Sequence, residues 1–127
     1  MTNTRRSRFV VLTKDDQPFA GHKLGSLAAA IHALLRFGNT PMSEGDIIRS
    51  TRSIAHDLGT VDHYGTVMGH LNFWHNLERD RNRKQHVYLH TDVGWAINPN
   101  AVYNPQWQGG TDDDARRWYE TELRARR

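Results

Sequence analysis

The chain of 127 residues contains no cysteine. This absence excludes disulfide bonds, zinc sites built from thiolates and cysteine nucleophiles, and it suits a reducing compartment. Long apolar runs are missing as well, since no stretch approaches the roughly 20 residues that a helix needs to cross a bilayer. The first residues are basic but lead into no apolar signal core. We therefore expect a protein without a membrane segment that stays in the cytoplasm.

Lysine is scarce, and arginine carries most of the positive charge. The chain has 17 Lys and Arg against 14 Asp and Glu, a net charge of +3, and its only lysines are Lys14, Lys23 and Lys84. Guanidinium groups suit paired contacts with phosphate and guanine, although GC-rich coding produces the same bias. The excess is modest, so its distribution along the chain matters more than its size.

Three amphipathic helices are expected between residues 24 and 79. The first ends near residue 37, before Gly38, where a left-handed C-cap is usual. Ser43 is a good N-cap for the second helix, which Gly59 stops. The third begins near residue 62 or 66, and its inward face is expected to include Val67, Leu71 and Trp74.

After the basic stretch 79–84 the apolar period changes from helical to alternating. Val87 and Leu89 point to one side of the predicted strand 85–90, and His86, Tyr88 and His90 to the other. A turn at 91–94 and a return strand at 95–97 complete a β-hairpin.

The C-terminal part is expected to hold a turn-rich aromatic loop and a last helix that starts at Thr111. The apolar stripe of this helix either closes the domain's own core or pairs with a second copy of the chain. We favour a homodimer formed through Trp118, Tyr119 and Leu123. The chain is thus divided into an N-terminal arm with a short strand (1–23), a helical domain (24–98) and an aromatic loop with a helix (99–127).

The expected fold class is mainly α with a small β-hairpin. The order of its elements resembles the winged helix-turn-helix superfamily, and most closely the HARE type. The resemblance covers residues 24–98 and is carried by the segments 40–47, 67–71 and 87–97. It implies a winged helix with an added C-terminal helix. Such domains usually bind double-stranded DNA, and a minority bind proteins.

In such a domain the third helix enters the major groove and the wing follows the DNA backbone. The side chains expected to contact bases are His63, Thr66, His70, Asn72 and Asn76, and either asparagine could pair with adenine. The side chains expected to contact the backbone are Arg79, Arg81, Arg83, Lys84, His86, Tyr88 and His90. Because histidines titrate near pH 6.5, binding is expected to strengthen as the pH falls.

The eight histidines also raise the question of a metal site. His86 and His90 would lie about 13 Å apart on one strand face, too far to share an ion. We expect no metal, no cofactor and no catalytic residues. A loose resemblance to the HNH nuclease motif in Asp62-His63, Asn76 and His86 is a remote alternative. The preferred interpretation is a bacterial or phage transcription regulator that binds specific DNA sites, and the second is a protein-binding adaptor.

Overall fold

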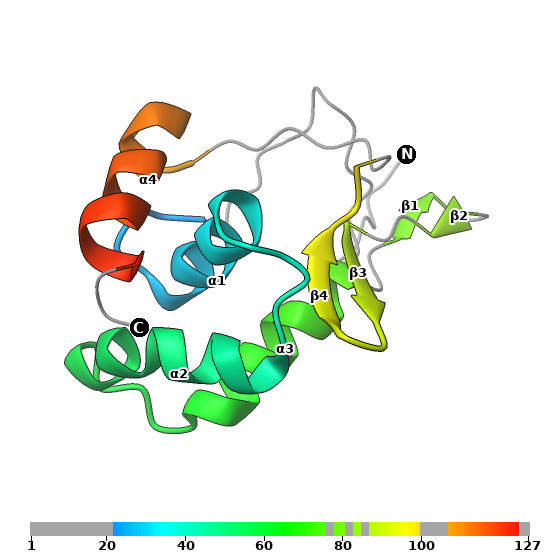
Figure 1. Cartoon of the computed structure of the whole chain (residues 1–127), viewed down its shortest axis with the longest axis horizontal. Coiled ribbons are helices and arrows are strands. Elements are labelled where there is room, and N and C mark those ends of the chain that lie inside the picture. Colours follow the sequence, from blue (N-terminus) through cyan, green and yellow to red (C-terminus); the bar gives the residue numbers. More distant parts are fainter. Residues whose placement is uncertain (1–21, 76–77, 81–82, 85–86, 100–106, 125–127) are drawn as a thin grey trace, which may run out of the picture.

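The computed structural model describes residues 22–75, 78–80, 83–84, 87–99 and 107–124 (Figure 1). These residues form mainly α-helix, together with small antiparallel hairpins, as the sequence predicts. None of the helices among them is long and apolar enough to cross a membrane.

Helix α1 (Leu27–Phe37) is the central helix of the molecule. Ser26 caps its first turn by accepting a hydrogen bond from the backbone N–H of Ala29 (3.1 Å). Its positions from Ala29 to Leu35 are all buried, so α1 is surrounded by other elements rather than packed along one side. The helix ends at Gly38, whose backbone is extended and not left-handed as expected. A side chain there would start 2.5 Å from the Leu34 carbonyl oxygen, so close approach explains the glycine.

Helix α2 (Glu44–Asp57) begins and ends as the sequence predicts. The Ser43 hydroxyl accepts a hydrogen bond from the backbone of Asp46 (3.1 Å), which confirms the N-cap. The chain leaves the helix through Gly59, which has a φ of +70°. The buried side of α2 contains Ile47, Ser50, Thr51, Ile54 and Ala55.

Helix α3 (His63–His75) follows after a short turn and is capped by Asp62. The Asp62 carboxylate accepts from the backbone N–H of Gly65 (3.0 Å), and its carbonyl accepts from Thr66 (2.9 Å). The buried residues of α3 are Val67, Leu71 and Trp74, which confirms the predicted inward face.

Strands β3 (Tyr88–Thr91) and β4 (Gly94–Ile97) form the predicted hairpin. The segment between α1 and α2 extends this sheet, because Met42 and Trp95 exchange backbone hydrogen bonds of 2.9 and 2.8 Å. Strands β1 (Glu78–Asp80) and β2 (Arg83–Lys84) form a second hairpin, with an irregular register. The sequence predicts only a basic connection here, so this hairpin is an additional element.

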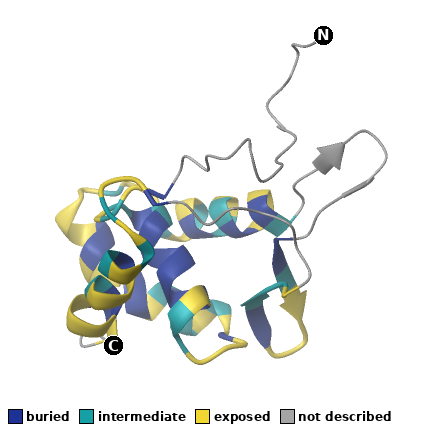
Figure 2. Ribbon diagram, turned by 90° about the horizontal axis from the view of Figure 1, so that it is seen from above, coloured by how far each residue is buried: buried dark blue, intermediate teal, exposed yellow. Residues whose placement is uncertain are grey.

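Helix α4 (Asp112–Trp118) and the π-helical turn η1 (Tyr119–Leu123) pack against α1. Thr111 and Asp114 form a capping box at the start of α4. Figure 2 shows buried positions on the inner sides of these helices and exposed positions on the outer sides. Trp107, Ala115, Tyr119 and Leu123 belong to the same apolar core as α1, α2 and α3.

The favoured dimer surface therefore needs correction. Tyr119 is 5 % exposed and Leu123 is fully buried in the chain's own core, while Trp118 is only half-buried. Burial within one copy leaves Tyr119 and Leu123 unavailable to a second copy. Tyr119 and Leu123 instead close the domain's own core, which is the other interpretation of this apolar stripe.

Candidate nucleic-acid interface

The outer side of α3 is open to solvent along most of the helix. Thr66, Gly69, Asn72 and Phe73 are exposed, which agrees with the expectation for Thr66 and Asn72. No atom of a neighbouring element lies within 4 Å of the point where a side chain at Gly69 would begin. The helix backbone is therefore accessible at Gly69, with hydrogen-bonding side chains on either side of it.

His63 lies at the edge of this face and is bound to α2. Its Nε2 is 2.8 Å from the Thr51 hydroxyl, and that hydroxyl donates to the Ile47 carbonyl (2.8 Å). The hydroxyl thus accepts from the imidazole N–H. Burial, reinforced by the charge of Arg52, lowers the pKa of His63.

His70 faces the interior rather than the proposed DNA side. Its Nε2 lies 3.0 Å from the Tyr88 hydroxyl. Burial, together with the neighbouring His22, lowers the pKa of His70 to about 3. The prediction that His70 contacts a base is not supported by this orientation.

Tyr88 requires a clear correction, because it was expected on the outer side of the hairpin. Its side chain is fully buried. The hydroxyl is hydrogen-bonded to His70 and also to His32 Nδ1 (2.8 Å). A buried phenol with two protein partners cannot reach a phosphate, so Tyr88 is a structural residue.

His90 is exposed on β3, as predicted. Its ring stacks on the buried indole of Trp95, with centroids 4.0 Å apart and planes at 6°. The next hairpin residues include Val93, which is 67 % exposed. The end of the β3–β4 hairpin is therefore accessible, and one face of the His90 ring is held by Trp95.

The remaining candidates are the basic stretch and its neighbours. Arg79 lies in β1, and Arg83 and Lys84 in β2, where the structure describes the backbone only. Asn76, Arg81 and His86 lie outside the described residues.

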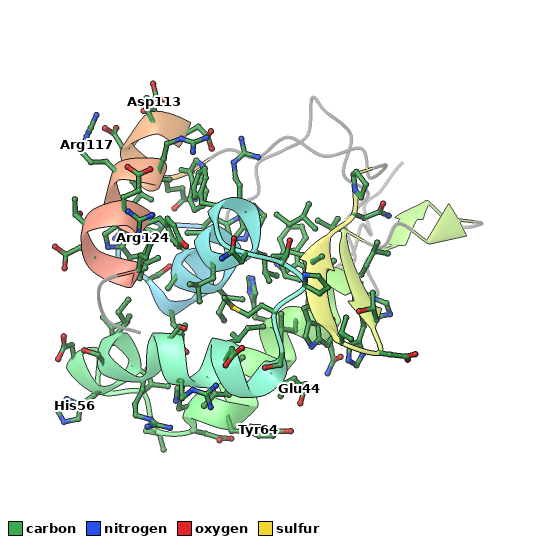
Figure 3. All side chains as sticks on the ribbon, viewed as in Figure 1. Glu44, His56, Tyr64, Asp113, Arg117 and Arg124 are labelled. Carbon is green, nitrogen blue, oxygen red and sulfur yellow. The ribbon has the colours of Figure 1, made fainter. Side chains whose placement is uncertain are left out.

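Sequence reasoning missed two arginines on α2, Arg49 and Arg52, which are both exposed. Arg49 forms an ion pair with Asp46 one turn earlier. Arg52 is close enough to His63 to lower its pKa, so it carries positive charge to the edge of the α3 face. Their positions between the buried residues of α2 could have identified them as solvent-facing cations. Figure 3 shows His56 on α2 and Tyr64 on α3 pointing away from the body of the molecule.

The charge of the histidines differs from the expectation. Burial lowers the pKa of His22 to about 4 and that of His32 well below its usual range. Burial and the neighbouring His22 likewise lower the pKa of His70 to about 3. His22, His32 and His70 therefore stay neutral near pH 6.5 and do not contribute to the expected strengthening of DNA binding as the pH falls towards 6.

Among the described residues, no three His, Asp or Glu side chains come together as a metal site would require. Comparison of the chain with protein-family models, with curated proteins and with solved structures finds no match.

Proposed function

We propose that residues 24–98 form a winged helix-turn-helix domain that binds double-stranded DNA, with α3 in the major groove and the β3–β4 hairpin as the wing. The observation that carries this proposal is the exposed outer side of α3. It combines an accessible backbone at Gly69 with Thr66 and Asn72, whose side chains can hydrogen-bond to base edges. Such a face fits a groove better than it fits a protein core.

The arrangement of the elements supports the same proposal. Helix α1, the bridging residue Met42, helices α2 and α3 and the β3–β4 hairpin follow the order of a winged helix, with the β1–β2 hairpin as an additional element between α3 and β3. The end of α3 is tied to the hairpin, because the Trp74 carbonyl accepts from Val87 N–H (3.0 Å) and His75 Nδ1–H donates to the Tyr88 carbonyl (2.8 Å). A recognition helix braced in this way keeps its orientation when it docks.

Elements that neighbour α3 in the chain supply cations. Arg52 lies beside it on α2, and the backbone of Arg83 and Lys84 lies in the β1–β2 hairpin after α3. Engagement of four to six phosphates would give log Kd a salt dependence with a slope of about 4 to 5. Base contacts from α3 would add sequence preference, as a bacterial or phage transcription regulator in the cytoplasm needs.

The test is selection of duplexes from a random pool, followed by affinity measurements at several salt concentrations. Asn72→Ala should change sequence preference and weaken the selected site by about tenfold, while Asn39→Ala, also exposed but outside α3, should not. Arg52→Ala should weaken all duplexes alike and reduce the salt slope by about 1. Arg117→Ala is its control, because Arg117 lies on the outer side of α4 (Figure 3). Equal effects of Asn72→Ala and Asn39→Ala would contradict base reading by α3.

A protein-binding adaptor is the second candidate, and exposed apolar side chains favour it. Leu58, Val61 and Tyr64 around the α2–α3 turn are 54 %, 99 % and 60 % exposed. A groove of about 170 Å³ beside them is lined by Ile54, Leu58 and Trp118. Duplex binding with a steep salt slope supports the DNA proposal, whereas no binding to any duplex at low salt supports the adaptor.

The nuclease alternative has less support. His63 is bonded to Thr51 on α2, Asp62 caps α3, and Asn76 and His86 lie outside the described residues. A plasmid-nicking assay with Mg²⁺ or Zn²⁺, comparing the wild type with His63→Ala, distinguishes this alternative from a binding protein.

A further inference from the structure

Three histidines from separate segments meet inside the molecule around one tyrosine. His22 precedes α1, His32 lies on α1 and His70 on α3, while Tyr88 belongs to β3. The His22 and His32 rings are stacked with centroids 4.2 Å apart, and the His22 and His70 centroids are 5.6 Å apart. We call these four residues the imidazole cluster.

The hydrogen bonds of the cluster suit neutral rings. The Tyr88 hydroxyl has one proton, so it donates to one of its two histidine partners and accepts from the other. If both rings were protonated, both would donate to the same oxygen, and the Tyr88 proton would lose its acceptor in this pair of bonds. Protonation therefore disturbs the bonds that join α1, α3 and β3.

Burial and neighbouring like charges oppose a positive charge on the cluster. The titratable and charged groups around it are Arg36 on α1, His75 on α3 and Asp112 on α4, whose carboxylate pairs with Arg36 and accepts from Trp107 Nε1. Trp74 and Trp107 cover the His22 ring, at centroid distances of 5.3 and 5.9 Å. His22, His70 and Arg36 lower the pKa of His32, and His22 lowers that of His70, beyond the effect of burial. Each added proton therefore repels the next.

We propose that the imidazole cluster is an acid-sensitive lock: in its neutral form it holds α3 against α1 and β3, and its protonation releases α3 while α1 and α2 stay folded. Burial opposes the first proton, so the lock stays closed at neutral pH. Once one ring is charged, its neighbours at 4.2 and 5.6 Å are destabilised together.

Helix α3 is the element expected to leave first. It buries only Val67, Leu71 and Trp74, whereas most of α1 is buried. Gly69, in the middle of α3, lowers the intrinsic stability of the helix relative to alanine. Without its contacts to the cluster, α3 has less to hold it than α1 or α2. The consequence for DNA rests on the proposed function: acidification should abolish binding by removing the recognition helix.

Hydrogen exchange and imidazole ¹⁵N shifts of the full chain, measured by NMR from about pH 7.5 to about pH 3.5, test the lock. Exchange rates are corrected for the intrinsic effect of pH. We expect α3 amides to lose protection at a higher pH than α1 and α2 amides, in step with protonation of the cluster. His22→Phe keeps a stacked ring without a titrating group and should move the opening down by about half a pH unit. His56→Gln, at an exposed histidine on α2, should leave it unchanged.

Loss of protection in α1, α2 and α3 at one common pH would overturn the proposal. So would imidazoles that titrate near pH 6.5 while α3 stays protected. If His22→Phe does not fold, His70→Gln replaces it as the test variant. The wild-type imidazole shifts then still show whether α3 opens as the cluster is protonated. The two proposals can be contradicted separately. If the chain binds no duplex at neutral pH, the DNA proposal is contradicted. The hydrogen-exchange pattern of α1, α2 and α3 tests the acid-sensitive lock in either case.

Discussion

Met42 and Trp95 hold the hairpin to the helical body through a pair of backbone hydrogen bonds, 2.9 Å and 2.8 Å long. Gly94 makes this approach possible, because a side chain at that position would start 2.5 Å from the Met42 carbonyl carbon and oxygen. Its φ of +151° is also a conformation that side chains other than glycine rarely adopt. The hairpin is therefore held to the helical body by backbone hydrogen bonds, and its position depends on Gly94.

Gly94→Ala should destabilise the protein by about 2 to 4 kcal/mol, since either the Met42 pairing or the turn has to shift. Urea unfolding followed by tryptophan fluorescence measures the effect. An unfolding free energy within about 0.5 kcal/mol of the wild type would show that the hairpin is seated differently.

Gly69→Ala should have the opposite effect on stability. The position is exposed, in the middle of α3 and free of neighbouring elements within 4 Å, so alanine should add up to about 1 kcal/mol. If α3 docks closely on DNA, the added methyl group should at the same time weaken duplex binding. Thermal unfolding and affinity measured on the same sample check both changes. Higher stability with unchanged affinity would show that DNA does not approach α3 at Gly69.

Tyr88→Phe removes a buried hydroxyl that both His32 and His70 use. Leaving two buried ring nitrogens without this partner should cost about 1 to 3 kcal/mol. Tyr64→Phe is the matched control, because Tyr64 is 60 % exposed and should tolerate the change. Chemical denaturation of both variants provides the comparison, and equal stability of the two would contradict the cluster geometry.

Asp112→Asn should loosen α4 from α1. The Asp112 carboxylate accepts from Arg36 Nε (2.8 Å) and Nη2 (2.9 Å) and from Trp107 Nε1 (2.9 Å). Burial alone would raise the pKa of Asp112, but the hydrogen bonds from Arg36 and Trp107 outweigh it and the pKa is lowered. The pair is partly exposed, so we expect a loss of only about 1 kcal/mol. Asp113→Asn, an exposed neighbour in the same turn, should show no loss in thermal unfolding.

Global stability should fall as the medium becomes acidic. The unfolded chain binds protons at its histidines near pH 6.5, whereas burial holds the pKa of His22 at about 4 and that of His70 at about 3 in the folded chain. The unfolded state thus binds more protons between about pH 6.5 and pH 4, and the stability present above pH 6.5 is lost across that interval. His22 alone contributes roughly 3 kcal/mol to this loss. Urea titrations at several pH values measure it, and a flat profile down to about pH 4.5 would contradict buried neutral histidines.

Local signals in the sequence predicted much of the fold. The cap at Ser43, the stop at Gly59 and the inward residues of α3 were correct, because each depends on a few neighbouring residues. Tyr88 was misassigned because strict alternation was assumed, whereas Val87 and Tyr88 are both buried where β3 begins, and the Tyr88 hydroxyl reaches α1 and α3. Its aromatic ring suits the core, and its hydroxyl finds partners 18 and 56 positions away in the chain.

The candidate interface was predicted in part. Thr66 and Asn72 followed from the helical period, since the side opposite a buried stripe is exposed. The inward orientation of His70 did not follow, because a histidine beside a stripe can face either way until its partner on another element is known. His22 gave no local signal at all, since its contacts lie on α1, α3 and the segment around Trp107.

The burial of α1 has a consequence for how the chain can be divided. One side of α1 is covered by α4 and η1, through buried residues such as Tyr119 and Leu123. A fragment cut after residue 98 would expose that side of the helix to water. Such a fragment should aggregate or bind hydrophobic dyes, even though it contains every element of the proposed DNA-binding unit. We therefore expect the smallest autonomous piece of this protein to extend at least to residue 123.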